Sequence, residues 1–220
     1  MNPTRRRVGL GLAVVATSAA GLAASLAGCV SVGSADGAAA LTLHQWHDTS
    51  PAPARRDTPL VAALLIQTLQ ADALADTSAI AYSRRANEFS LYQWASWTER
   101  PVRQLPRLLL HRLEARGLAG AVGLLGDPLR ADWLLVLAVD TLYHDVSTAP
   151  GIARFALSAE LFDRRSRTRM ARRQFERSWP TERADSSAAA LALSQALSAS
   201  FDALLPWLED ALQRAGVARP

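Results

Sequence analysis

Hydrophobic and polar positions alternate along one stretch of the chain and recur with a helical period along two others. Between Ile152 and Phe162, apolar side chains occupy every second position, which predicts an antiparallel strand with one face in the core. Between Val102 and Leu113, and again between Leu193 and Leu212, apolar residues recur at intervals of three or four, which predicts two amphipathic helices. The domain therefore combines strands and helices.

Further strands are predicted where apolar runs end in turn residues. Residues 60–69 form a continuous apolar run that suits a buried strand, although periodicity alone does not separate such a run from a helix. Residues 80–83 and 89–93 flank a polar turn and predict a hairpin. Residues 133–143 and 168–179 are each long enough for a strand. The order of elements is strand, hairpin, helix, three or four strands, helix.

This order predicts an α+β fold, in which a single domain has a mainly antiparallel sheet with two principal helices packed on it. Gly117 supplies a stop for the first helix, and Asp185 with Ser186 supplies N-terminal caps for the second. Pro106 should kink the first helix or mark its first turn, and Pro206 predicts a kink or a restart in the second.

The N-terminal region is typical of a secretory signal. Arg5, Arg6 and Arg7 precede a long uncharged stretch that ends in small residues. Cys29 follows directly and is the only cysteine in the chain. Leu26-Ala27-Gly28-Cys29 resembles the lipobox of bacterial lipoproteins, which implies cleavage between Gly28 and Cys29 and acylation of Cys29. A transmembrane anchor, or an ordinary cleaved signal with a spare thiol, would be the alternatives, but Gly, Ser and Thr dilute the stretch and no basic stop follows it.

Composition sets the expected domain boundaries. We expect a lipoprotein signal at 1–28, a lipidated N-terminus and flexible tether at 29–57, the folded domain at 58–214 and a tail at 215–220. The tether assignment rests on Gly, Ser and Ala after the cysteine and on a second polar stretch that contains two prolines. A short edge strand is expected at 41–46, inside this tether.

Charge and lysine usage exclude several classes of function. The net charge is +4, but three of these charges are the signal arginines, which leaves the mature chain near +1. Nothing in this balance argues for nucleic acid, which needs a clustered basic face and would also conflict with export. The chain contains no lysine, which excludes a P-loop, a Schiff-base lysine and a Ser-x-x-Lys nucleophile. The glycines from Gly117 to Gly126 miss the spacing of a phosphate loop and predict a mobile link.

No catalytic constellation, cofactor motif or metal site is predicted. His44 and His47 are three residues apart on an extended segment and would point to opposite faces. His111 and His144 have no second ligand at a suitable spacing and are expected to be surface or capping residues. Asp140 lies in an apolar strand and is expected to pair with an arginine on a neighbouring strand.

Three aromatic residues, Tyr92, Trp94 and Trp97, cluster before Pro101 and admit two interpretations. Trp97 could fill the hinge between the hairpin and the first helix as a core residue. If the cluster is exposed, it is the best candidate in the chain for contact with a partner. Tyr92 and Trp94 have the same strand parity and could present their side chains together.

The same segment resembles the ABC-type transport auxiliary lipoproteins, periplasmic partners of MCE-type lipid-transport systems. The similar residues are Ile80-Ala81-Tyr82, Leu91-Tyr92, Trp97-Thr98-Glu99-Arg100-Pro101, Leu108-Leu109 with Leu113, Ala131-Asp132-Trp133-Leu134, Arg173-Gln174-Phe175 before Pro180, and 192–208. The family typically has Arg-Trp-Ala before acidic and proline residues, whereas this chain has Ser96 and Thr98 around Trp97.

The resemblance implies a non-enzymatic accessory without a cofactor, whose partners are an MCE-type protein with its ABC permease and ATPase and, through the acyl anchor, a membrane. Val30 stands where lipoproteins retained in the inner membrane commonly have Asp, which implies the periplasmic face of the outer membrane. A homo-oligomer is left open. The alternative is a periplasmic lipid carrier with an internal acyl cavity, and a third hypothesis is a surface hydrolase with an unrecognised site.

Overall fold

The computed structural model of the chain describes residues 40–69 and 73–217. The expected signal at 1–28, the lipidation residue Cys29, the first part of the tether and residues 218–220 lie outside the described residues.

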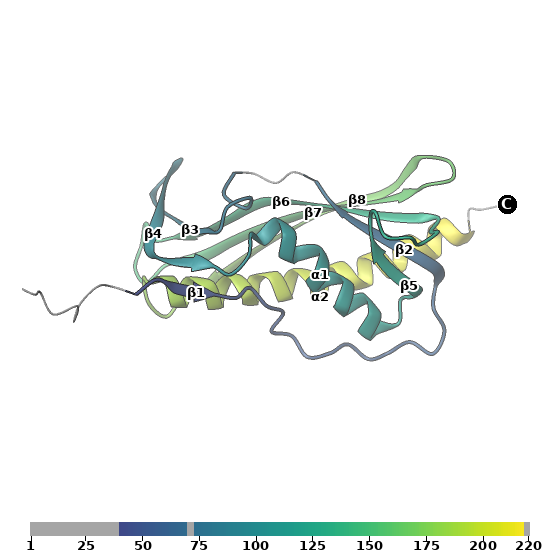
Figure 1. Cartoon of the computed structure of the whole chain (residues 1–220), viewed down its shortest axis with the longest axis horizontal. Coiled ribbons are helices and arrows are strands. Elements are labelled where there is room, and N and C mark those ends of the chain that lie inside the picture. Colours follow the sequence, from purple (N-terminus) through teal and green to yellow (C-terminus); the bar gives the residue numbers. More distant parts are fainter. Residues whose placement is uncertain (1–39, 70–72, 218–220) are drawn as a thin grey trace, which may run out of the picture. The chain divides into compact units, whose positions relative to one another are not determined.

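Eight strands form one sheet, and two long helices accompany it (Figure 1). In chain order the elements are β1 (Thr42–His44), β2 (Val61–Thr68), β3 (Ala79–Arg85), β4 (Glu88–Trp97), α1 (Pro101–Arg116), β5 (Ala119–Leu124), β6 (Trp133–Asp145), β7 (Ile152–Asp163), β8 (Thr168–Pro180) and α2 (Ser186–Val217).

Strand β6 joins the parts of the sheet. One of its edges is divided between two strands, with β2 beside its first half and β3 beside its last residues. Its other edge pairs with β7 along nearly the whole strand. The remaining strands extend outward, with β5 on β2, β4 and then β1 on β3, and β8 on β7. The predicted α+β fold is confirmed.

The longest pairings in the sheet are antiparallel, as predicted. Strands β6, β7 and β8 form two antiparallel ladders, and β3 with β4 forms the predicted hairpin. Four shorter pairings are parallel: β2 with β5 and with β6, β3 with β6, and β1 with β4. The strand patterns did not predict these parallel pairings because a pattern of alternation fixes a strand's faces but not its neighbours.

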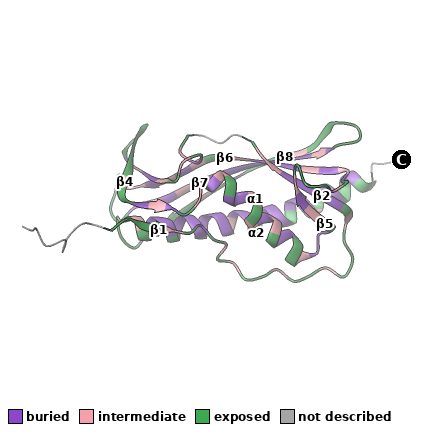
Figure 2. Ribbon diagram, in the orientation of Figure 1, coloured by how far each residue is buried: buried purple, intermediate pink, exposed green. Residues whose placement is uncertain are grey.

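The apolar faces of both helices are buried, as their periodicity predicts. Helix α2 packs against β6, β7 and β8, whereas α1 packs against β2 and β5. Figure 2 shows buried residues along most of α2. This helix is long and apolar enough to cross a membrane, but 72% of its most apolar window is buried inside the domain, which is typical of a core helix. The fully buried leucines and phenylalanine of the two faces are Leu105, Leu109, Leu113, Leu197, Phe201, Leu204 and Leu208.

The helix ends follow the predicted signals, but the internal prolines do not interrupt the helices. Gly117 adopts a left-handed conformation with φ of 68° and closes α1 by donating its N–H to Glu114 O at 3.0 Å. Asp185 Oδ1 accepts the N–H of Ala188 at 2.8 Å at the start of α2. Pro106 lies inside α1 and Pro206 inside α2, so neither marks a helix start. Because α2 continues to residue 217, the expected tail at 215 was placed too early.

Much of the expected tether belongs to the folded domain. The edge strand expected at 41–46 is present as β1. After it, Trp46 is fully buried and its ring lies 5.6 Å from that of Phe155. Thr49 donates its N–H to Ser198 on α2 at 2.7 Å. The proline-rich composition of this stretch is typical of a loop, but these contacts hold the loop in place.

Arg112 shows why this loop is fixed. Arg112 lies on α1 between positions of its apolar stripe, and only 6% of its surface is exposed. Its guanidinium donates to Asp48 Oδ2 at 2.7 Å and also to Asp202 on α2. One buried cation therefore joins the loop, α1 and α2, and its two carboxylates compensate for its burial.

The glycine-rich segment after α1 is the strand β5 and not a mobile link. Its pairing with β2 brings the two backbones close together, and a Cβ at Gly120 would lie 2.8 Å from Ala62 O. Glycine is therefore required here for close approach rather than for flexibility.

We predict that Gly120→Ala lowers the free energy of unfolding by about 1–3 kcal/mol, because the added methyl group meets a backbone oxygen that cannot move away easily. Gly216→Ala is the control, since a Cβ there meets nothing within 4 Å. Urea unfolding of both variants would check this, and equal stability of the two variants would contradict it.

Candidate functional site

The predicted aromatic cluster lies at an irregularity in β4. In the ladder between β3 and β4, Ala79 pairs with Ser96 and Ala81 with Leu91, so β4 advances by five residues while β3 advances by two. Four residues, 92–95, therefore lie opposite one residue of β3, and the three extra residues form a bulge. Bulges of this kind redirect side chains and are common beside functional sites.

The bulge forms one wall of a groove of about 520 Å³, which we call the β4 groove. The other walls are β3, which contributes Tyr82 and Arg84, and the start of α2 with the residues before it, which contributes Asp185. Trp94 lies at the groove with 59% of its surface exposed, more than any other large hydrophobic residue described.

The structure separates the three predicted aromatic residues. Trp94 is exposed and Tyr92 is half-buried, and both line the β4 groove. Trp97 is 2% exposed and its ring lies 6.3 Å from that of Trp46, so it is a core residue and cannot contact a partner directly. The expectation that Trp97 contacts a partner is therefore wrong, and the hinge interpretation holds for it.

A chain of polar side chains lies behind the groove. His144 is fully buried, with Tyr92 Oη 2.8 Å from its Nδ1 and Thr181 Oγ1 3.0 Å from its Nε2. Thr181 donates its own hydroxyl proton to Pro150 O at 3.0 Å, so it must accept from His144 Nε2. His144 Nδ1 then accepts from Tyr92. Each polar group in this chain is satisfied when His144 is neutral.

The sequence did not predict the burial of His144, because β6 contains an irregularity of its own. The register between β6 and β7 shifts between Val139 and Thr141. Before the shift the odd-numbered residues of β6 are buried, and after it Leu142 and His144 are buried. Gly151 was a usable signal, since a side chain there would overlap the His144 ring.

The electrostatics of the groove follow from burial and from Asp185. Burial raises the pKa of Tyr92 to about 12, with a further contribution from the negative charge of Asp185. Burial lowers the pKa of His144, so the neutral form is favoured. The N–H of Ala188 and the guanidinium of Arg183 lower the pKa of Asp185, which stays ionised at the mouth of the groove.

The arrangement is suited to binding rather than to acid-base chemistry. Tyr82 and Tyr92 lie 4.8 Å apart between ring centres, and the Arg84 guanidinium lies 5.2 Å from the Tyr82 ring. Aromatic residues and arginine are enriched at interfaces between proteins, and both occur in this groove. The imidazole of His144 is buried with both nitrogens engaged, so it presents no free base to the groove.

The other candidate residues do not assemble into a site. Within residues 40–69 and 73–217, no three His, Cys, Asp or Glu residues are grouped so that they could hold a metal ion. His47 Nδ1 lies 3.1 Å from the carbonyl oxygen of Gln45. Asp140 does not pair with an arginine as expected, because its Oδ2 accepts from Ser158 at 2.6 Å and from Gln174 at 3.1 Å.

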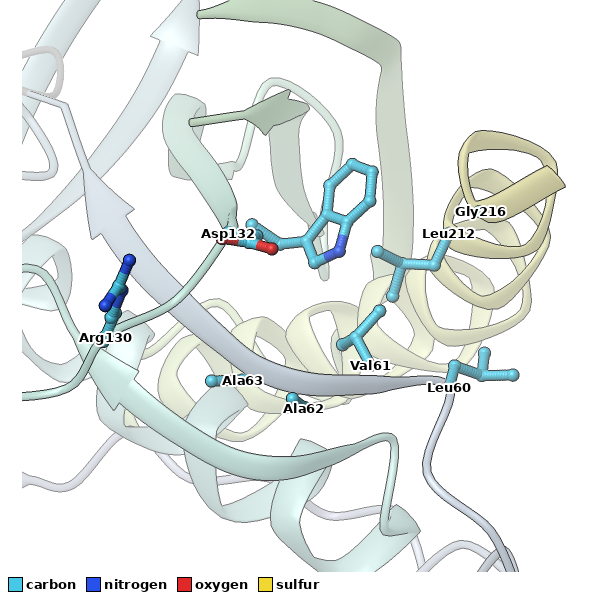
Figure 3. A pocket seen from close by; sticks show the side chains of 9 residues that line it. Leu60, Val61, Ala62, Ala63, Arg130, Asp132, Leu212 and Gly216 are labelled. Carbon is cyan, nitrogen blue, oxygen red and sulfur yellow. The ribbon is translucent and has the colours of Figure 1, made fainter. Parts of the chain in front are cut away.

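A second recess, of about 360 Å³, lies where β2 and β6 begin and α2 ends (Figure 3). Arg130 and Asp132 lie on one side of it, and Leu212 of α2 lies on another. No sequence pattern predicts this recess, because it forms between segments that are distant in the chain.

Comparison with protein families identifies one match. The model of the family described as ABC-type transport auxiliary lipoprotein component matches residues 19–204. No curated protein matches the chain.

Solved structures show the same fold. The crystal structure of a Xanthomonas campestris protein, described as belonging to the DUF330 family, superposes on this chain with a TM-score of 0.68 and 23% sequence identity. The match covers 80% of this chain and 100% of that one. A structure described only as an uncharacterized protein has a TM-score of 0.55 and 15% identity, over 76% of this chain and 99% of that one. At these identities the likeness establishes the fold alone.

We predict that the chain loses stability as the pH falls below about 6.5, and that His144 contributes to this loss. Burial lowers the pKa of His144 in the folded chain. Below about pH 6.5 the imidazole is therefore protonated in the unfolded chain but still neutral in the folded chain, and this difference in proton binding favours unfolding. Burial lowers the pKa of His44 as well, so the two histidines act in the same direction.

His144→Gln should cost about 1–3 kcal/mol at pH 7.5, because it disturbs buried hydrogen bonds, and should reduce the dependence of stability on pH. Urea unfolding at pH 7.5, 6.5 and 5.5 measures both effects, with His111→Gln on the surface of α1 as the control. A pH dependence identical to that of the unsubstituted protein would contradict the prediction.

Proposed function

Because the chain belongs to the family of ABC-type transport auxiliary lipoprotein components, we propose that it is a non-enzymatic docking lipoprotein of an MCE-type intermembrane lipid transport system. In this proposal acyl groups on Cys29 hold it at the periplasmic face of the outer membrane. Its partner is the MCE component, which works with an ABC permease and ATPase. The ATP-binding lysine of a P-loop is missing from this chain, so the energy for transport comes from another subunit.

The exposure of Trp94 is the observation that carries the docking proposal. A tryptophan side chain with 59% of its surface in solvent, beside a groove with a fixed polar floor, is the kind of residue that anchors an interface. The bulge at 92–95 makes this exposure possible, because it takes Trp94 out of the regular alternation of β4.

Anchoring by Cys29 is supported by the sequence. The basic residues, the apolar stretch and the lipobox-like residues up to Cys29 occur in the expected order. Stable membrane anchoring needs more than one acyl chain, which multiple acylation of an N-terminal cysteine provides. The outer-membrane assignment rests on Val30 in the position after the cysteine.

The alternative, a lipid carrier with an internal acyl cavity, has less support. Such a carrier needs an apolar cavity of several hundred Å³ between the sheet and the helices. In this chain Trp46, Phe155 and Phe201 are buried in that space. Both recesses described above include charged residues in their walls, Arg84 and Asp185 in one and Arg130 and Asp132 in the other.

We predict that Trp94→Ala strongly reduces co-purification of the MCE component and its permease from detergent extracts. Loss of an interface anchor costs about 2 kcal/mol or more, which is roughly a 30-fold loss of affinity. Trp179→Ala is the matched control, because Trp179 lies on β8 with 37% of its surface exposed. The thermal stability of both variants should be unchanged. Equal recovery of partners with both variants would contradict docking through Trp94.

We predict that Cys29→Ser releases the protein from membranes or stops its processing at the precursor length. Membrane fractionation with immunoblotting measures location and length together. Ser34→Ala, in the same segment, is the control and should leave both unchanged. A mature-length Cys29→Ser product that stays in the membrane fraction would rule out the acyl anchor.

A further inference from the structure

The hairpin between β7 and β8 carries an unusual concentration of positive charge. Residues 164–173 include six arginines and no acidic residue. Glu160 on β7 lies 3.4 Å from Arg169 and 3.3 Å from Arg172, so one carboxylate serves two of these guanidinium groups. Arg173 lies over the ring of Phe175 at 5.5 Å.

Arg165 and Arg167 are among the hairpin arginines that have no carboxylate partner in the part of the chain that the structure describes. They lie in the turn itself, and residues 164–170 are all exposed. Figure 2 shows this exposed end of the hairpin next to β8. The turn is nevertheless well fixed, because the buried Asp163 accepts the N–H of Arg165 at 2.8 Å. The charges are therefore held at a defined position without being neutralised there.

Arg164, one of these six arginines, fixes the base of the hairpin. Arg164 donates to Ala131 O at 2.9 Å, and its N–H donates to Asp132 O at 2.8 Å. These bonds hold the hairpin against the segment that includes Arg130, which lines the recess in Figure 3. The six hairpin arginines exceed the net charge of about +1 on the mature chain, so the rest of the mature chain is net negative. Such a distribution orients a molecule toward an anionic surface.

We propose that this hairpin binds the phosphate headgroups of an anionic lipid surface. Guanidinium groups suit phosphate because they donate two parallel hydrogen bonds and stay charged at any physiological pH. The choice of a lipid surface over an acidic protein rests on the proposed function, because an acyl anchor keeps lipid headgroups close to the domain at all times.

The length of the tether restricts how the domain can lie on the membrane. From Cys29 to residue 40, a fully extended chain spans at most about 40 Å. Strand β6, whose first residue pairs with the end of β7 beside the hairpin, has 13 residues and is about 43 Å long, and β1 enters the sheet toward its other end. The anchor and the hairpin therefore share one membrane when β6 lies along the membrane surface and not when it stands upright on it.

The test uses the mature chain from residue 29 with Cys29→Ser, so that no acyl group contributes to binding. Its co-sedimentation is measured with vesicles of phosphatidylcholine alone and with vesicles containing about one third phosphatidylglycerol, at low and high salt. We expect binding only to the anionic vesicles and its loss at high salt. Arg165→Gln combined with Arg167→Asn should weaken this binding about 30-fold, the factor for two arginines at about 1 kcal/mol each.

The substitutions are chosen to leave the fold intact. Asn tolerates the left-handed backbone of residue 167, where φ is 58°. Arg103→Gln combined with Arg214→Gln is the control, because it removes the same charge from the exposed surfaces of α1 and α2. The control should bind like the unsubstituted chain.

Three results would overturn the proposal: no binding to anionic vesicles, equal binding to neutral vesicles, or equal losses in the hairpin and control variants. The proposal would also be wrong if the hairpin variant still bound vesicles but no longer co-purified with a protein that the unsubstituted chain retains. That result would assign the hairpin to an acidic protein partner. These results can be told apart from a failure of the proposed function. The proposed function is tested by the location and length of the Cys29→Ser product and by the proteins that co-purify with the native chain.

Discussion

The fold depends on the hydrogen bonds along the two edges of β6. One edge pairs with β7 along nearly its whole length, and the other edge pairs with β2 in its first half and with β3 at its end. Among the described strands, β6 alone connects the β7–β8, β2–β5 and β3–β4 parts of the sheet. This arrangement sets the positions of both surfaces discussed above. The β4 groove lies beyond the end of β6 where β3 pairs, and the arginine-rich hairpin lies at the end where Trp133 pairs with Asp163.

Two local irregularities in otherwise regular strands create the groove. The extra residues in β4 expose Trp94, and the register shift in β6 turns His144 into the protein behind Tyr92. Each irregularity has a cost in strand pairing, and the polar chain from Tyr92 to Pro150 compensates for the burial of the imidazole. The groove is consequently rigid at its floor and open at Trp94.

Sequence patterns predicted the elements and most of the core, because alternation and helical period report which face of an element is buried. They did not predict the parallel partners of β6 or the strand nature of the segment around Gly120, since both depend on contacts between distant segments. They placed His144 at the surface or at a cap, and they gave no sign that Arg112 is buried. A one-residue shift in β6 reverses the faces of a strand, and the carboxylates of Asp48 and Asp202 that accompany Arg112 are far from it in sequence. Of the two interpretations of the aromatic cluster, the sequence could not choose for Trp97, because its burial depends on packing against Trp46, which is distant in the chain.

The entry of the chain through β1 has a mechanical consequence. If the N-terminus is anchored by lipid as proposed, a force applied to it would act first on the short ladder between β1 and β4, which joins Thr42, Leu43 and His44 to their partners. If that ladder opened, the load would pass to the indole of Trp46, wedged against Phe155, and then to the ionic contact between Asp48 and Arg112. Under the proposed anchoring, a strand ladder, the packing of two rings and an ionic pair would oppose a pull on the N-terminus one after another. Strand β4, which forms a wall of the groove, would be affected first.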